Sequence, residues 1–77
     1  MVRCEFTSDV LTDRVQFNVT TEGVSVRRSA YAYHPIWKWD QGSLVDVPCG
    51  RWASSIRNAI GPDILARIFK ARARMEK

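Results

Sequence analysis

The chain has 77 residues, of which 45% are hydrophobic and 26% charged, and its formal net charge is +4. These values are ordinary for one small globular domain and exclude a multidomain, collagen-like or low-complexity protein. No apolar run approaches the roughly 20 residues of a membrane-spanning helix, and residues 1–5 lack the apolar stretch of a signal peptide. We therefore expect a single domain over residues 1–77, in the cytoplasm, without membrane contact and with reduced cysteines.

Alternating apolar and polar residues predict the first strands. Residues 2–7 alternate in this way and indicate a first strand, and residues 15–20 repeat the pattern as a half-buried second strand. The residues between them, 8–13, are interpreted as a loop, with the continuation of a strand as the alternative.

Residues 21–23 supply the turn of a hairpin, in which Gly23 is free to take a positive φ. The returning strand opens at Val24 and extends at most to Tyr33.

A second hairpin follows. His34 and Pro35 are expected to interrupt strand pairing, because proline has no amide donor. Residues 36–39 and 44–47 then indicate two short strands, and the polar residues 40–43 form the loop between them.

The C-terminal part has helical periodicity. Residues 52–60 place Trp, Ala and Ile side chains on one side of a helical wheel, with Arg57 among the polar residues on the other side. Gly61 suits the position after a helix, and Pro62 suits the first turn of the next. The pattern predicts either two helices joined by a tight turn or one helix kinked at this point.

These elements predict an α+β fold: an antiparallel sheet of about four or five strands, with one face covered by one or two C-terminal helices. Residues 1–47 form the hairpins of the sheet, and residues 51–77 form the helical segment with a basic end.

The net charge is confined to that end. Residues 1–66 carry seven basic and seven acidic side chains, whereas residues 67–77 carry five basic and one acidic. Such asymmetry favours an acidic partner, either nucleic acid or an acidic protein surface.

On a helical wheel, four cations lie on the side opposite the apolar arc and form a basic stripe: Arg67, Lys70, Arg74 and Lys77. A phosphate backbone would favour this geometry. The alternative is a solvated helix face whose cations suit the helix dipole.

Arg72 falls in the middle of the apolar arc. Because a charged group is seldom buried without a partner, either the last turn projects beyond Phe69 or Arg72 pairs with a carboxylate. The projecting turn is the simpler interpretation.

The segment from Tyr31 to Trp39 is rich in aromatic residues. If the strand from Val24 is unbroken, Arg27, Tyr31 and Tyr33 face solvent and form a stacking platform for bases. A bulge at Arg27 and Arg28 would instead turn both tyrosines into the core.

Trp37 and Trp39 share one face of a strand, with Lys38 opposite. A core this small needs large rings, so a core role is favoured for these tryptophans over a place on a stacking platform.

Catalysis and metal binding have little support in the sequence. Cys4, His34 and Cys49 lack the paired spacing of zinc ligands, and nothing brings Cys49 and His34 together as nucleophile and base. We expect no enzyme, no metal and no cofactor.

The functional prediction is a small regulatory protein that binds nucleic acid through the basic stripe, helped by Arg27, Arg28, Tyr31 and Tyr33. The alternative is a small inhibitor or adaptor, of the kind that viruses and mobile elements encode, that blocks a host or defence nucleic-acid enzyme. In that case the stripe docks on the enzyme, with Trp37 or Trp39 as anchors. A homodimer is possible, and a homo-oligomeric structural protein is the third interpretation.

Overall fold

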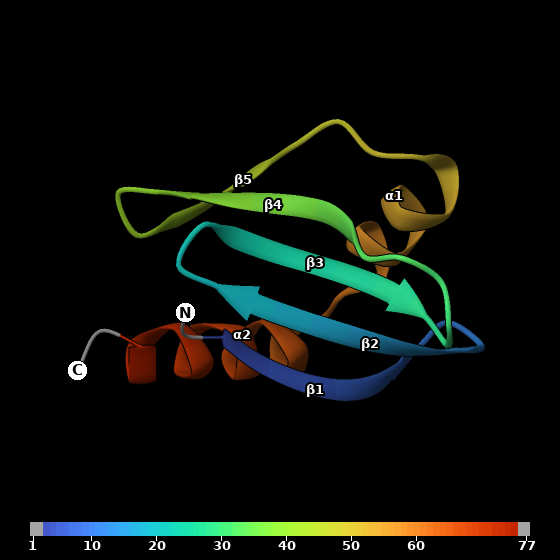
Figure 1. Cartoon of the computed structure of the whole chain (residues 1–77), viewed down its shortest axis with the longest axis horizontal. Coiled ribbons are helices and arrows are strands. Elements are labelled where there is room, and N and C mark those ends of the chain that lie inside the picture. Colours follow the sequence, from blue (N-terminus) through green and yellow to red (C-terminus); the bar gives the residue numbers. More distant parts are fainter. Residues whose placement is uncertain (1–2, 76–77) are drawn as a thin grey trace.

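The computed structural model describes residues 3–75, which form one five-stranded antiparallel sheet and two helices (Figure 1). The strands follow each other in the sheet in chain order. Their bounds, and those of the helices, are β1 Arg3–Val10, β2 Asp13–Thr20, β3 Gly23–Arg28, β4 His34–Asp40, β5 Ser43–Asp46, α1 Arg51–Ala59 and α2 Pro62–Met75. The predicted α+β fold is therefore confirmed.

Both helices pack on the same face of the sheet, here called the helix face (Figure 1). Alternation along the strands places the apolar side chains on this face and polar ones on the opposite, open face. The residues with less than 5% exposure form one core: Val10, Val15, Phe17, Val19, Val24, Val26, Ile36, Ala53, Ile56, Ile68 and Ala71.

The first hairpin is longer than the loop interpretation of residues 8–13 allows. β1 and β2 pair over eight positions, from Arg3 opposite Thr20 to Val10 opposite Asp13. Leu11 takes a φ of 56°, so two residues suffice for the turn. The loop interpretation is wrong and its alternative, continuation of the strand, is correct.

Gly23 is required for close packing, not for a positive φ as expected. It is the first residue of β3, and a Cβ atom there would overlap the carbonyl oxygen of Trp37 on β4. The turn before it is held by Thr20, whose Oγ1 accepts hydrogen bonds from the amides of Glu22 and Gly23 at 3.1 and 3.2 Å.

β3 ends at Arg28 and does not run to Tyr33. Ser29 takes a φ of 53°, and the Tyr31 amide donates to the carbonyl of Arg28 at 3.0 Å, which closes a turn. Little in the sequence indicates this turn. Ser29 has the left-handed backbone conformation, but serine is a weaker turn signal than glycine.

His34 and Pro35 belong to β4 and do not interrupt it as expected. They pair with Val26 and Ser25, and the register then shifts so that Trp37 lies opposite Val24. This bulge leaves Ile36 without an opposite residue, and Ile36 is fully buried. Proline is tolerated beside a bulge because the ladder is already broken there.

The helical segment forms two helices, so the kinked single helix is excluded. α1 ends at Ala59, Ile60 is extended with φ −71° and ψ 124°, and α2 begins at Pro62. Proline at the first helical position lacks an amide that would have had no partner there.

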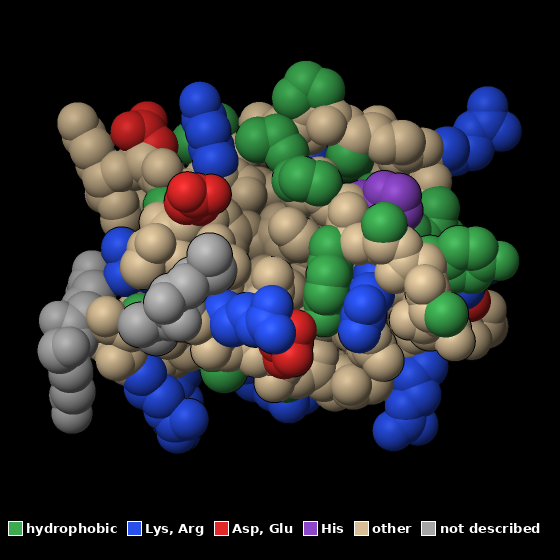
Figure 2. All heavy atoms as spheres, in the orientation of Figure 1, with side chains coloured by type: hydrophobic (Ala, Val, Ile, Leu, Met, Phe, Trp, Pro, Cys, Tyr) green, Lys and Arg blue, Asp and Glu red, His purple; other side chains and the backbone are tan. Residues whose placement is uncertain are grey.

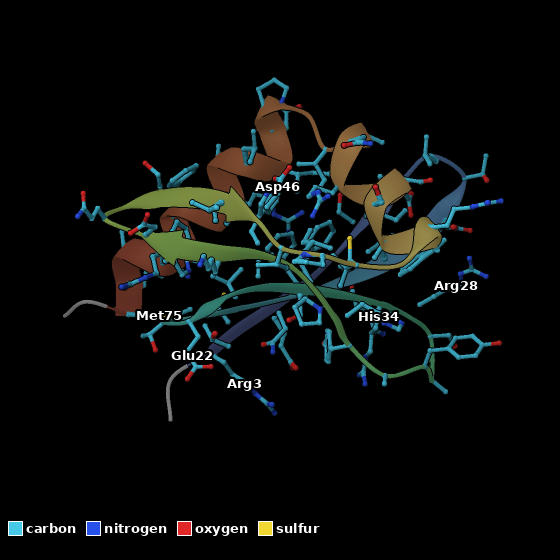
Figure 3. All side chains as sticks on the ribbon, turned by 90° about the horizontal axis from the view of Figure 1, so that it is seen from above. Arg3, Glu22, Arg28, His34, Asp46 and Met75 are labelled. Carbon is cyan, nitrogen blue, oxygen red and sulfur yellow. The ribbon has the colours of Figure 1, made fainter. Side chains whose placement is uncertain are left out.

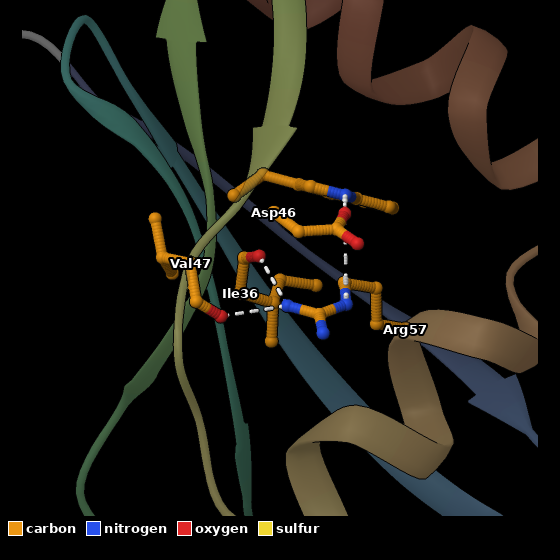
Figure 4. Close-up of polar contacts among 5 residues, drawn as sticks. Ile36, Asp46, Val47 and Arg57 are labelled. Carbon is orange, nitrogen blue, oxygen red and sulfur yellow. Dashed lines mark hydrogen bonds and ion pairs between the residues drawn. The ribbon is translucent and has the colours of Figure 1, made fainter.

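Arg57 of α1 points into the molecule, although the helical wheel placed it among solvated residues. Its Nη1 donates to the carbonyls of Ile36 and Val47 at 2.9 and 2.8 Å (Figure 4). Its Nε lies 3.7 Å from Asp46 Oδ1, which also accepts a hydrogen bond from the Trp37 indole at 2.9 Å. One side chain thus joins α1 to β4 and to the chain after β5.

Candidate binding surface along β1 and α2

α2 lies against β1 and β2 and is docked along its whole length. Ile68 and Ala71 are buried, and Ile64 and Met75 pack against the same core. The last turn therefore does not project as expected. Arg72 is half-buried with its Cζ 5.7 Å from the centre of the Trp39 ring, so its stem covers apolar surface while its charge lies on an aromatic face.

Three cations of the predicted stripe project from α2 on the flank beside β1. Arg67, Lys70 and Arg74 are exposed, and Lys77 lies outside the described residues. Within residues 3–75, no carboxylate oxygen comes within 4.0 Å of their charged nitrogens. We call these three residues the basic flank. Helical rise places Arg67 and Arg74 about 10 Å apart along the axis.

The basic flank is fixed to the sheet through Phe6 of β1. The Arg67 Cζ lies 4.2 Å from the centre of the Phe6 ring, and this ring stacks on Phe17 with 4.9 Å between centroids. Because Phe17 is fully buried, the cation is positioned by the core itself.

A hollow of about 350 Å³ separates the basic flank from β1. Its lining combines apolar, acidic and basic side chains: Cys4, Glu5, Phe6, Arg67, Lys70, Ala71 and Arg74. We call it the β1–α2 groove. Figure 2 shows Lys and Arg side chains projecting along the lower edge of the molecule, over which β1 and α2 run in Figure 1.

Glu5 contributes one negative charge to the groove, and its carboxylate contacts two neighbouring side chains. Its carboxylate lies 3.9 Å from Arg3 Nε and accepts a hydrogen bond from the Tyr33 hydroxyl at 3.2 Å. Burial raises the pKa of Tyr33 above 10.0, and the neighbouring Glu5 carboxylate raises it further. Tyr33 therefore holds Glu5 in place as a neutral donor.

β1 forms one edge of the sheet, and its outer side is open. Its eight pairs with β2 are in unbroken register without a bulge. No hydrogen bond joins its outward backbone groups to any other residue in the described range 3–75. A long, regular and unpaired edge is the type of strand that pairs with other chains.

The remaining predicted residues do not join the basic flank in one platform. Arg27 and Arg28 are successive strand residues and face opposite sides of the sheet. The Arg27 guanidinium covers the Tyr33 ring at 4.5 Å on the open face. Arg28 lies 5.0 Å from the Trp52 ring and 3.6 Å from Asp13 on the helix face.

The two tyrosines are also separated. Tyr31 is 65% exposed and lines a different hollow with Arg28, His34 and Trp52. Figure 3 places Arg28 and His34 at the opposite end of the sheet from Arg3 and Met75. Neither the joint platform nor the buried pair is observed, because both interpretations required β3 to reach Tyr33.

Trp37 and Trp39 are engaged within the chain. The Trp37 indole donates to Asp46, and the Trp39 indole donates to the carbonyl of Thr20 at 2.9 Å. Trp39 also meets Phe69 edge-on at 5.6 Å. These bonds favour the structural role over the role of partner anchors.

The sequence offered no sign of Arg3, Glu5 and Phe6 as groove residues. Their alternation predicts a strand but does not say which strand lies at the edge or which helix lies beside it. The groove depends on contacts between residues more than 60 positions apart.

The described residues contain no group of three or more His, Cys, Asp and Glu side chains placed to hold a metal ion. No hydrogen bond or ion pair connects Cys49 with His34 within residues 3–75. Neither α1 nor α2 combines the length and apolar composition needed to cross a membrane. Comparison with protein-family models, curated proteins and solved structures gives no match.

Proposed function

We propose that this is a small non-catalytic binding protein, an adaptor or inhibitor, that docks on an acidic segment of a partner protein through the β1–α2 groove. The observation that carries the proposal is the basic flank, whose three cations project beside an open strand and have no carboxylate partner within residues 3–75.

The fold explains this arrangement only in part, through the contact of Arg67 with the Phe6 ring. Like charges one helical turn apart destabilise a helix by roughly 0.2–0.5 kcal/mol per pair. The helix dipole favours cations in the last turn, which accounts for Arg74. It does not account for Arg67, which lies in the first half of α2. A binding partner of opposite charge would explain why three cations lie together on this flank.

Protein is favoured over nucleic acid because of what lies beside the cations. The groove is bordered by an open strand, whose backbone groups repeat at the spacing of another polypeptide backbone. It also contains Glu5, which would repel a continuous run of phosphates but can face the neutral or basic side chains of a mixed segment.

Nucleic acid remains the second candidate, supported by the one-turn spacing of the cations and by Tyr33 and Arg27 on the neighbouring open face. Three phosphate contacts would give a salt dependence of log K with a slope of about −2 to −3. For either candidate we also propose a cytoplasmic location, which is supported by two free cysteines, Cys4 and Cys49.

Fluorescence anisotropy with an acidic peptide, a DNA single strand and an RNA single strand of matched charge separates the two candidates. The test variant carries Arg67→Gln, Lys70→Gln and Arg74→Gln. The control variant removes the same charge elsewhere through Arg14→Gln, Lys38→Gln and Arg51→Gln, all at exposed positions. We expect peptide binding that only the test variant loses. Tighter oligonucleotide binding that only the test variant loses would establish the second candidate instead.

A further inference from the structure

The outer edge of β1 and the basic flank border the same groove, and together they define how a partner would bind. β1 supplies eight residues of regular strand without a bulge or proline, and no segment within residues 3–75 covers its outer edge. A segment lying in the groove would therefore meet backbone donors and acceptors on one side and cations on the other.

The side chains of β1 set the geometry of an added strand. Cys4, Phe6 and Ser8 face the helix side, whereas Glu5 and Thr7 face the open side. A strand paired with β1 would alternate in the same way, with every second side chain directed toward α2. Three such side chains span about 13 Å, against about 10 Å between Arg67 and Arg74.

We propose that β1 accepts an extended acidic segment of the partner as a sixth strand, with carboxylates at every second position reaching Arg67, Lys70 and Arg74. This inference rests on the proposed function and names the form of the ligand. Backbone hydrogen bonds to β1 hold the segment, and the basic flank selects its sequence. The antiparallel direction is expected, since that pairing is slightly more stable per residue.

A second copy of this chain fits the same edge poorly. Its β1 would direct Cys4, Phe6 and Ser8 toward the groove and bring no carboxylate to the helix side. It would also bring its own basic flank to the shared edge, so that two sets of like charges would face each other. The flank therefore opposes self-pairing and admits an acidic strand.

The test uses synthetic eight-residue peptides and isothermal titration calorimetry at low salt. The first peptide alternates Thr and Glu, and the second has the same composition in two blocks, Thr first and Glu last. Two further versions of the alternating peptide carry backbone N-methyl groups, either on every Thr or on every Glu. In a strand, the amides of these two sets point to opposite edges, so each set of methyl groups blocks one edge.

We expect the alternating peptide to bind at least about tenfold more tightly than the peptide with separate Thr and Glu blocks. Of the two N-methylated versions, only one should lose binding. Equal affinity of all four peptides would overturn strand addition and leave the proposed function standing, because charge alone would then explain the binding. Absence of binding by every peptide, with binding of an oligonucleotide, would overturn both. A dimer in light scattering that the alternating peptide fails to dissociate would also overturn the inference.

Discussion

The side of the molecule formed by β4, β5 and α1 uses its charged groups differently from the side formed by β1 and α2. On the first side, Arg57 is 14% exposed and engages two carbonyls and one carboxylate (Figure 4). On the second side, the three cations of the basic flank project into solvent. Basic residues of both sides lie on amphipathic helices, so only their surroundings separate a structural cation from one available for binding.

The largest expected effect is that of Arg57→Ala. Removing this side chain deletes two part-buried hydrogen bonds from a charged donor. The carbonyl of Val47 loses this partner, whereas the carbonyl of Ile36 keeps the hydrogen bond from the Val47 amide at 3.2 Å. We expect a loss of about 3 kcal/mol in the free energy of unfolding, which lowers Tm by roughly 12–24 °C in a domain of this size. Thermal unfolding followed by circular dichroism measures it. A change in Tm below a few degrees would remove the structural role assigned to Arg57.

Gly23→Ala is expected to have the next largest effect. The new methyl group would overlap the Trp37 carbonyl oxygen and force β3 and β4 apart, at a cost of about 1–3 kcal/mol. Gly61→Ala is the matched control, since a Cβ atom there meets nothing within 4 Å. Urea unfolding should separate the two variants clearly. Equal stability of the two variants would contradict the close packing of β4 against Gly23.

Tyr33→Phe tests the β1 side and has a smaller effect. Because the pKa of Tyr33 is raised in the folded state, its contribution to stability is present below pH 10 and is lost as pH rises through the folded value. The wild type should therefore lose more stability between pH 9 and pH 11 than Tyr33→Phe does. Tyr31→Phe, at a 65% exposed ring, is the matched control. Parallel slopes for wild type and Tyr33→Phe would argue against the contact with Glu5.

The smallest effect on stability is expected from removal of the basic flank. Arg67→Gln loses the contact with the Phe6 ring, which contributes about 0.5–1 kcal/mol. Together with Lys70→Gln and Arg74→Gln it also relieves two like-charge repulsions of roughly 0.2–0.5 kcal/mol each. The two effects offset each other, so Tm should stay within about 2 °C of the wild type. Scanning calorimetry gives this comparison directly. A fall in Tm similar to that of Arg57→Ala would show that the basic flank stabilises the fold as Arg57 does.

The fold followed from local patterns, because alternation and helical periodicity report which residues face the core. They predicted a strand over residues 15–20 and, with one kinked helix as the alternative, a second helix beginning near Pro62. They failed where tertiary contacts decide the conformation. Ser29 ends β3 without a glycine, and the bulge that buries Ile36 depends on pairing with a strand ten residues away.

The candidate site was predictable only in part. Charge and helical spacing identified Arg67, Lys70 and Arg74, because all three lie on one helix. The prediction grouped them with Arg28 and Tyr31, which line a different hollow from the basic flank. The contribution of β1 was missed, because no sequence pattern specifies which strand lies at an edge.

The most direct test of the central claim is the affinity of the alternating Thr-Glu peptide for two variants of equal net charge. One variant lacks the basic flank, and the other carries Arg14→Gln, Lys38→Gln and Arg51→Gln. We predict that the first binds at least about tenfold more weakly than the wild type and that the second changes by less than about twofold. Equal weakening of both would show that binding depends on overall charge and would contradict a specific acidic-strand site beside β1.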